Sequence, residues 1–509
     1  MDKGRMKAKQ DWLKQAAQEA PQQLALIHGD QSWDYLALDQ AVTSWAGRLL
    51  TAGVRPGQHI GVLMPNRAEW VFLLHALARI GAVLLPLNIR LTAEELSWQA
   101  AYAETTFVIF DDSTTVQIHG LGSIAKAISL EQLQSLTPDD TANWDLPAFD
   151  PNALQSIVFT SGTTGFPKGA ALSYANHSAS AQASAQRLGT QPNDRWLLCM
   201  PLYHVGGMAI LLRSCFYRTA TILLRGFDER AVLDAIDAQK ATIISLVPTM
   251  LARLLSISRS AASLQTLRLI LLGGAAADEQ LLVQAAALDL KVGLTYGLSE
   301  AASQVSTATP EETRHKPGTV GKPLVGTSVK IVDQGGSVLP AGEIGEVLVS
   351  GPTLMQGYYL QLKTSSKTFQ NDWLHTGDLG YLDLDGDLWL VQRRVDLIIS
   401  GGENIYPSEV EKVLLSNPSV AQACVVGLPD EEWGQQVAAA VVLEPGQHVS
   451  ARELVDTFCR QHLAGYKIPR QIIFYESLPL TASGKIQRRK VCELVLASID
   501  SLTERESII

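Results

Sequence analysis

The sequence predicts an α/β protein with a large N-terminal domain of mainly parallel sheets, including a barrel-like section, and a small α+β domain at the C-terminus. Short apolar runs alternate with helical patterns through the first three quarters of the chain. Turns rich in Gly and Asp begin near residue 328, and a new α+β pattern starts after residue 394. Strands and helices that alternate at this spacing indicate parallel sheets covered on both faces.

The first parallel elements are expected on either side of one apolar helix. A strand is predicted over 59–64, then a helix that Asn66 caps and that runs to Arg79, and then a strand over 82–87. The stretch 71–87 is interrupted by His75 and Arg79, so a buried helix and strand are expected there rather than a membrane span. Further buried strands are predicted over 107–110, 156–160, 196–200, 221–224, 242–247 and 267–272.

The barrel-like section is expected from antiparallel strands over 329–332, 346–349 and 388–391. The acidic run 383–387 is interpreted as a hairpin turn, because its spacing does not match a calcium-binding loop. Beyond residue 394, Ser408 and Glu411 predict a capping box for a helix to Leu415, with strands over 423–426 and 437–443. We therefore place the two domains at 1–394 and 395–509.

Composition excludes several classes of protein. The chain has 509 residues, of which 46% are hydrophobic and 18% charged, unlike a disordered, collagenous or coiled-coil protein. Its net charge of −10 makes nucleic acid and anionic membranes poor partners. Five widely spaced cysteines without a C-x-x-C pair favour a reducing compartment, the cytoplasm, over a disulfide framework or a zinc site. No apolar signal-peptide segment follows the basic start.

The most informative motif is a loop rich in hydroxyls and glycines directly after the predicted strand 156–160. Its backbone N–H groups and hydroxyls can surround a polyphosphate, and Lys168 can neutralise a leaving pyrophosphate. A Walker A loop is excluded because Pro167 and Gly169 flank this lysine; the remaining alternative is a solvated turn. The predicted phosphate-binding residues are Thr160, Ser161, Gly162, Thr163, Thr164, Gly165 and Lys168.

This loop resembles the phosphate loop of the adenylate-forming superfamily, which includes acyl-CoA synthetases, adenylation domains and luciferases. Four further motifs match that family in order and spacing, so the resemblance covers nearly the whole chain; they lie at 296–300, 373–378, 393–407 and 481–485. The resemblance implies an AMP-forming acid–thiol ligase that uses ATP, Mg²⁺ and coenzyme A.

The other motifs predict the remaining contacts to ATP. Tyr296 can lie flat against a purine, and Glu300 offers Mg²⁺ a hard oxygen ligand. Asp378 can accept hydrogen bonds from the ribose hydroxyls, and Arg393 can add a donor. The alternatives are a buried tyrosine, a surface glutamate and a turn-forming aspartate. The predicted nucleotide-binding set is completed by Gly273, Gly274, Gly297 and Ser299.

The resemblance also implies a catalytic role for Lys485 and a mobile C-terminal domain. In the family the matching lysine reaches the carboxylate and the α-phosphate during adenylation; the domain then swings, and a thiol attacks the adenylate. Gly401 and Gly402 would then line the channel for the pantetheine arm. The hinge is expected at 394–396, where Val395 departs from the family's usual residues. The alternative for Lys485 is a free surface lysine.

Two residues between the phosphate loop and Glu300 are candidates for contact with the acid. His204 precedes an apolar helix over 209–217 and is interpreted as a catalytic gate over the acyl pocket; the alternative is a packed core histidine. Arg213 is the only charge in that helix, so it needs a carboxylate from the protein or the substrate, or a route to the surface.

Among the subfamilies, the resemblance is strongest to the 2-succinylbenzoate-CoA ligases of menaquinone and phylloquinone biosynthesis, through stretches 201–207, 271–275, 296–304 and 400–407. That family places a basic residue where Arg213 falls, which implies a substrate with two carboxylates, and Gly273 would lie beside its acyl group. The alternatives are a ligase for another aryl or medium-chain fatty acid and a catalytically silent acyl- or nucleotide-binding protein. A homodimer is one hypothesis for the assembly.

Overall fold

The computed structural model describes residues 11–138, 144, 149–160, 167–258, 260–361, 368–392, 397–479 and 486–506, with side chains except at 392 and 500–506. The chain divides into two units. The first comprises Met1–Ile89, Gln99–Val158 and Gly169–Gln392, and the second comprises Arg90–Trp98, Phe159–Lys168 and Arg393–Ile509. The boundary predicted at 394 lies outside the described residues, so the division into 1–394 and 395–509 stays a prediction.

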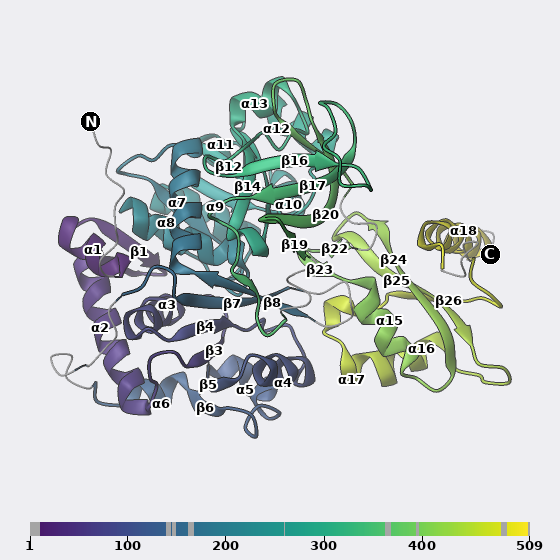
Figure 1. Ribbon diagram of the computed structural model, residues 1–509, viewed down its shortest axis with the longest axis horizontal. Helices are drawn as coiled ribbons and strands as arrows, with labels where there is room; N and C mark the ends of the chain where they lie inside the picture. The colour runs from purple at the N-terminus through teal and green to yellow at the C-terminus, as the bar shows by residue number, and fades with distance from the viewer. Residues whose placement is uncertain are drawn as a thin grey trace. The chain divides into compact units, whose positions relative to one another are not determined.

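A nine-stranded sheet carries much of the predicted parallel pattern. Its strand order is β15-β14-β13-β12-β11-β9-β10-β1-β2. Of these strands, β1, β12 and β14 are labelled in Figure 1. The run from β13 to β1 is parallel, whereas β14, β15 and β2 are antiparallel edge additions. The strands are β1 (Leu24–His28), β2 (Gln31–Asp34), β9 (Arg195–Leu198), β10 (Ala220–Leu223), β11 (Ile243–Leu246), β12 (Leu269–Leu272), β13 (Val292–Leu298), β14 (Ser303–Ala308) and β15 (Lys322–Pro323).

A seven-stranded sheet holds the first predicted strands, in the order β18-β8-β7-β4-β3-β5-β6. The strands from β7 to β6 are parallel, and β18 pairs antiparallel with β8. One hydrophobic core contains side chains from β3, β4 and β9 and therefore joins this sheet to the nine-stranded one. The strands are β3 (His59–Leu63), β4 (Val83–Pro86), β5 (Thr105–Phe110), β6 (Lys126–Ser129), β7 (Leu154–Thr160), β8 (Lys168–Ser173) and β18 (Gly357–Tyr358).

Helices connect the parallel strands, as the alternating pattern predicts. Among them α7 and α8 pack against each other, and α1 contacts α8. None of the described helices is both long and apolar enough to cross a membrane. The helices are α1 (Trp12–Glu19), α2 (Tyr35–Ala52), α3 (Ala68–Ile80), α4 (Ala93–Tyr102), α5 (Thr115–Ile118), α6 (Leu130–Ser135), α7 (Tyr174–Leu188), α8 (Val205–Tyr217), α9 (Glu229–Gln239), α10 (Pro248–Leu255), α11 (Ser260–Gln265), α12 (Glu279–Ala287) and α13 (Pro310–His315).

The section predicted to be barrel-like is a five-stranded antiparallel sheet of β16 (Ser328–Val332), β17 (Gly345–Ser350), β19 (Phe369–Gln370), β20 (Trp373–Leu382) and β21 (Leu388–Gln392). The pairings among the described residues form an open path rather than a closed ring. The C-terminal part of the second unit is α+β, as predicted. Its elements are β22 (Ile398–Ser400), β23 (Glu403–Ile405), β24 (Val420–Asp430), β25 (Gly434–Leu443), β26 (Gln471–Phe474), α15 (Pro407–Leu415), α16 (Ala451–Glu453), α17 (Arg460–His462) and α18 (Arg488–Glu506).

Two predicted helix caps are wrong. Helix α3 begins after Arg67, and Asn66 instead donates to the carbonyl oxygens of Met200 and Leu224 and accepts from the Leu202 N–H. Helix α15 begins at Pro407, because proline suits the first helical position, and its cap residue has no side-chain hydrogen bond. Glu411, the other predicted capping residue, accepts from the Val425 N–H and pairs with Arg488.

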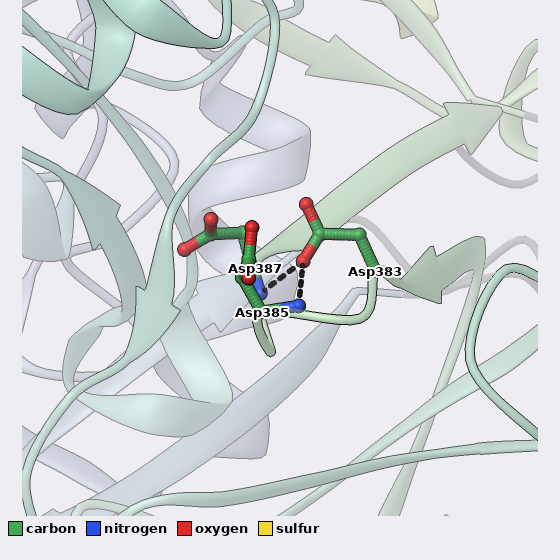
Figure 2. Close-up of side chains that lie close together, drawn as sticks. All are labelled: Asp383, Asp385 and Asp387. Carbon is green, nitrogen blue, oxygen red and sulfur yellow. Dashed lines mark hydrogen bonds between the residues drawn. The ribbon is translucent and has the colours of Figure 1, made fainter.

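The acidic run 383–387 is the hairpin turn between β20 and β21, which confirms its prediction. Figure 2 shows Asp383 accepting two backbone N–H bonds, from Asp385 and Asp387, each 3.0 Å long. The three carboxylates lie close together, and the Lys316 ammonium lies 2.8, 2.6 and 2.7 Å from them. A lysine of this chain therefore offsets part of the negative charge of the cluster. Burial by itself would raise the pKa of Asp383. The ion pair with Lys316 and the backbone N–H bonds outweigh this effect and lower the pKa to about 2.

Replacing Lys316 by methionine is expected to lower the melting temperature at neutral pH by roughly 1–2 °C. Asp383 has a lower pKa in the folded chain than the ordinary value of about 3.9, so the unfolded chain binds more protons between these values. The difference between wild type and variant should therefore be complete above pH ~4 and shrink below it. Thermal melts across this range measure the effect, with exposed Lys322→Met as the control; an unchanged melting temperature for Lys316→Met would contradict it.

Candidate active site

The structure brings together two predicted nucleotide-binding side chains from distant parts of the sequence. Tyr296 on β13 donates a 2.6 Å hydrogen bond from its hydroxyl to Oδ2 of Asp378, which lies on β20. The Tyr296 side chain is almost fully buried. Its bond to Asp378 places a carboxylate oxygen at the end of β13, the strand that leads directly into Glu300.

Glu300 follows β13 in a short 3₁₀ turn over Ser299–Ala301. Its Oε1 accepts a 2.7 Å hydrogen bond from the Tyr358 hydroxyl, and its backbone oxygen accepts from the Met355 N–H. Tyr358 belongs to β18, which pairs with β8, the strand that follows the phosphate loop. The carboxylate is therefore held close to that strand. No described residue forms a hydrogen bond or ion pair with its second oxygen, so Glu300 fits a magnesium site as a hard oxygen ligand.

The ends of the phosphate loop lie on two strands of the seven-stranded sheet. Thr160 is the last residue of β7, Lys168 is the first of β8, and the Thr160 hydroxyl donates to the Lys168 carbonyl oxygen at 3.4 Å. The Lys168 side chain is buried. Ser161, Gly162, Thr163, Thr164 and Gly165 lie outside the described residues, as do Arg393 and Lys485.

Three predicted glycines occupy places where a side chain would not fit. A Cβ on Gly297 would lie 1.8 Å from the Ser303 oxygen, at the register shift between β13 and β14. A Cβ on Gly273 would lie 2.7 Å from Cγ2 of Thr295, and Gly274 has a φ of +81°. Because Gly273 and Gly274 directly follow β12, they lie beside the end of β13 that carries Tyr296.

His204 lies at the start of α8, in the stretch that follows β9. It is the residue before the first helical turn, its ring centroid lies 4.8 Å from that of Tyr203, and its side chain makes no capping bond. Asn66 holds the same stretch through Met200 and Leu202, with bonds of 2.9 and 3.0 Å. The path of the backbone toward His204 is thus fixed by a residue in the segment between β3 and α3.

Arg213 is buried in α8, with 3% of its surface exposed. Its Nη2 lies 3.3 Å from the Ser180 hydroxyl, which in turn donates to the Ala302 carbonyl oxygen, and its guanidinium lies 5.9 Å from the Trp196 ring centroid. Its Nε has no hydrogen-bond partner, and no carboxylate of the described residues forms an ion pair with it. Burial lowers the pKa of Arg213. A route to the surface is therefore excluded, and a buried cation is left without a counter-charge from the described residues.

Gly401 and Gly402 form the turn between β22 and β23 in the second unit. Both have positive φ, +58° and +84°, and a Cβ on Gly401 would lie 2.6 Å from the Trp433 ring. The Gly401 N–H donates to the Trp433 carbonyl oxygen at 2.8 Å. Close packing against Trp433 explains the first glycine, and the predicted pantetheine contact stays a prediction.

Two family models together match most of the chain. The family described as AMP-binding enzyme matches residues 13–359. The chain belongs to the AMP-binding enzyme family. The C-terminal domain of AMP-binding enzymes matches residues 409–485.

Several relatives of this AMP-binding enzyme are similar over nearly their full length. It is 39% identical to 2-succinylbenzoate–CoA ligase of Bacillus cereus over 490 residues, covering 96% of this chain and 99% of the relative. A double mutant of o-succinylbenzoate CoA synthetase from Bacillus subtilis, bound to its product analogue, has a TM-score of 0.89 and 38% identity, covering 94% of this chain and 97% of that one. The same synthetase in complex with ATP and magnesium has a TM-score of 0.72 and 38% identity, covering 94% and 98%.

Sequence reasoning missed two side chains of this AMP-binding enzyme that hold predicted site residues. Tyr358 donates to Glu300, and Glu346 on β17 accepts from the Gly377 N–H beside Asp378. Tyr358 lies in a two-residue strand, and Glu346 lies at a bulge, so neither follows a periodic pattern that the sequence displays. The motif 373–378 contains Gly377, to which Glu346 bonds, but it gave no indication of Glu346 itself.

Proposed function

We propose that this AMP-binding enzyme joins 2-succinylbenzoate to coenzyme A through an acyl-adenylate. In the first step a carboxylate oxygen bonds to the α-phosphorus of ATP, the bond from this phosphorus to the bridging oxygen breaks, and pyrophosphate leaves. In the second step the sulfur of coenzyme A attacks the acyl carbonyl, and AMP leaves. The near full-length similarity to 2-succinylbenzoate–CoA ligases supports both the ligation to coenzyme A and 2-succinylbenzoate as the acid substrate.

The hydrogen bond between Tyr296 and Asp378 is the main structural support for a nucleotide-binding site at these residues. Asp378 has Oδ2 fixed by the tyrosine and would accept hydrogen bonds from the ribose hydroxyls, with Arg393 as a further donor. Stacking of the purine on Tyr296 would require one face of this buried ring to open. Gly273, Gly274 and Gly297 would let the backbone approach the nucleotide closely.

The phosphates would meet the loop 160–165 and Lys168. Glu300, positioned by Tyr358, would hold a magnesium ion, which would supply positive charge to the phosphates. Lys485 would neutralise the charge that develops on the α-phosphate during adenylation. His204 would close over the reacting carboxylate, and Gly401 and Gly402 would let the pantetheine arm reach it.

The burial of Arg213 is an argument for an acid substrate with two carboxylates. A buried guanidinium without a carboxylate partner among the described residues gains most from an anionic group on the substrate. We assign the aromatic carboxylate of 2-succinylbenzoate to Arg213 and the aliphatic one to adenylation. The cysteines, none of which forms a disulfide among the described residues, suit a cytoplasmic enzyme. A homodimer is to be tested by light scattering.

ATP–pyrophosphate exchange with a panel of carboxylic acids, followed by detection of the CoA thioester, tests the proposal. We expect 2-succinylbenzoate to support both exchange and thioester formation with the highest kcat/KM. Preference for a benzoate or a medium-chain fatty acid would overturn the substrate, and no exchange with any acid would overturn the enzymatic function.

A further inference from the structure

The carboxylate of Asp378 lies at the end of a bulge in β20. Glu346 pairs with Leu379 and Leu348 pairs with His375, so three residues of β20, 376–378, lie opposite the single residue Val347 of β17. Gly377, in the middle of the bulge, has a φ of +71°, a conformation that favours glycine. Bulges of this kind redirect a side chain and leave backbone groups without partners in the ladder.

Two side chains replace the missing ladder bonds. The Glu346 Oε1 accepts from the Gly377 N–H at 2.9 Å, and its Oε2 lies 3.0 Å from Nδ1 of His375. The Thr376 hydroxyl donates to the Val347 carbonyl oxygen at 2.6 Å and accepts from the Asp378 N–H at 3.0 Å. The backbone on both sides of Gly377 is thus fastened to β17.

We propose that Glu346 is a positioning residue for Asp378 in the binding of the nucleotide ribose. This inference rests on the proposed function, because it needs ATP and AMP to place their ribose hydroxyls at Asp378. The Glu346 carboxylate contacts His375, before the bulge, and Gly377, within it. It therefore sets the direction in which the Asp378 side chain leaves the strand. Bonds to a charged acceptor are stronger than neutral ones, which suits a bulge that must stay fixed.

Calorimetric binding of AMP and of 2′,3′-dideoxy-AMP separates this role from a merely structural one. For Glu346→Ala we expect the Kd of AMP to rise roughly tenfold, as for the loss of a charge-assisted hydrogen bond, while the Kd of dideoxy-AMP changes less than about twofold. Wild-type preference for AMP over the dideoxy compound should therefore largely disappear. Glu346→Gln retains one acceptor oxygen and should give an intermediate Kd.

Glu343→Ala is the matched control, since Glu343 is an exposed glutamate three residues earlier. It should bind both nucleotides as the wild type does. If Glu346→Ala weakens both nucleotides equally, or leaves the Kd of AMP unchanged, the positioning role is wrong. If wild-type protein does not bind AMP, or binds it no better than dideoxy-AMP, the proposed nucleotide site itself fails.

Discussion

Replacing Arg213 by methionine is expected to lower kcat/KM for 2-succinylbenzoate about 100-fold, because a substrate carboxylate would lose a buried partner. Methionine fills much of the same volume and removes the charge together with the unpartnered Nε. Since burial already disfavours the charged guanidinium, the folded protein should tolerate the change. Steady-state kinetics with saturating ATP and coenzyme A measures the loss.

The sharper measurement compares 2-succinylbenzoate with 4-oxo-4-phenylbutanoate, which lacks the aromatic carboxylate. Wild-type enzyme should strongly prefer the dicarboxylate, and Arg213→Met should reduce that preference by most of its value, since only one substrate loses an ion pair. Arg230→Met on α9, at an exposed arginine, is the control and should leave the preference unchanged. An Arg213→Met enzyme with the wild-type preference would show that Arg213 does not bind the substrate.

Replacing Lys485 by alanine is expected to reduce adenylate formation by about 10³-fold, because the charge that develops on the α-phosphate loses its neutralising group. The second half-reaction, thiolysis of supplied acyl-adenylate, should change only a few-fold, since the family resemblance places this lysine away from the carbonyl in that step. Pyrophosphate exchange measures the first half-reaction, and release of AMP from the adenylate in the presence of coenzyme A measures the second.

Lys490→Ala, at an exposed lysine on α18, is the control for the loss of a positive charge in this region. It should leave both half-reactions intact. Equal losses in both half-reactions for Lys485→Ala would contradict the alternation of the C-terminal domain between the two steps.

The parallel strands were predictable because burial on both faces produces continuous apolar runs that need no partner to be recognised. All eight strands predicted between residues 59 and 272 coincide with strands of the two large sheets or overlap them. Helix caps were less predictable, because their side chains have competing partners far away in the sequence. Asn66 bonds with residues 134 to 158 positions later, which no local pattern reveals.

Separate sequence motifs singled out Tyr296 and Asp378, which the structure joins by a hydrogen bond; their roles toward the nucleotide stay predictions. The residues that hold those partners were not predictable in the same way. The role of Glu346 depends on a register shift between two strands, and that of Tyr358 depends on a two-residue pairing with β8. Register is set by tertiary packing, so a single sequence gives little information about it.

The hydrogen bonds of Asn66 affect the order in which parts of the protein unfold. Asn66 lies three residues after β3 of one sheet, and its side chain binds backbone groups that follow β9 and β10 of the other. The amide proton of Leu202 therefore exchanges with solvent only after its hydrogen bond to Asn66 opens. Because the two sheets also share one hydrophobic core, we expect them to lose structure as one cooperative unit, with the Leu202 amide protected until they do.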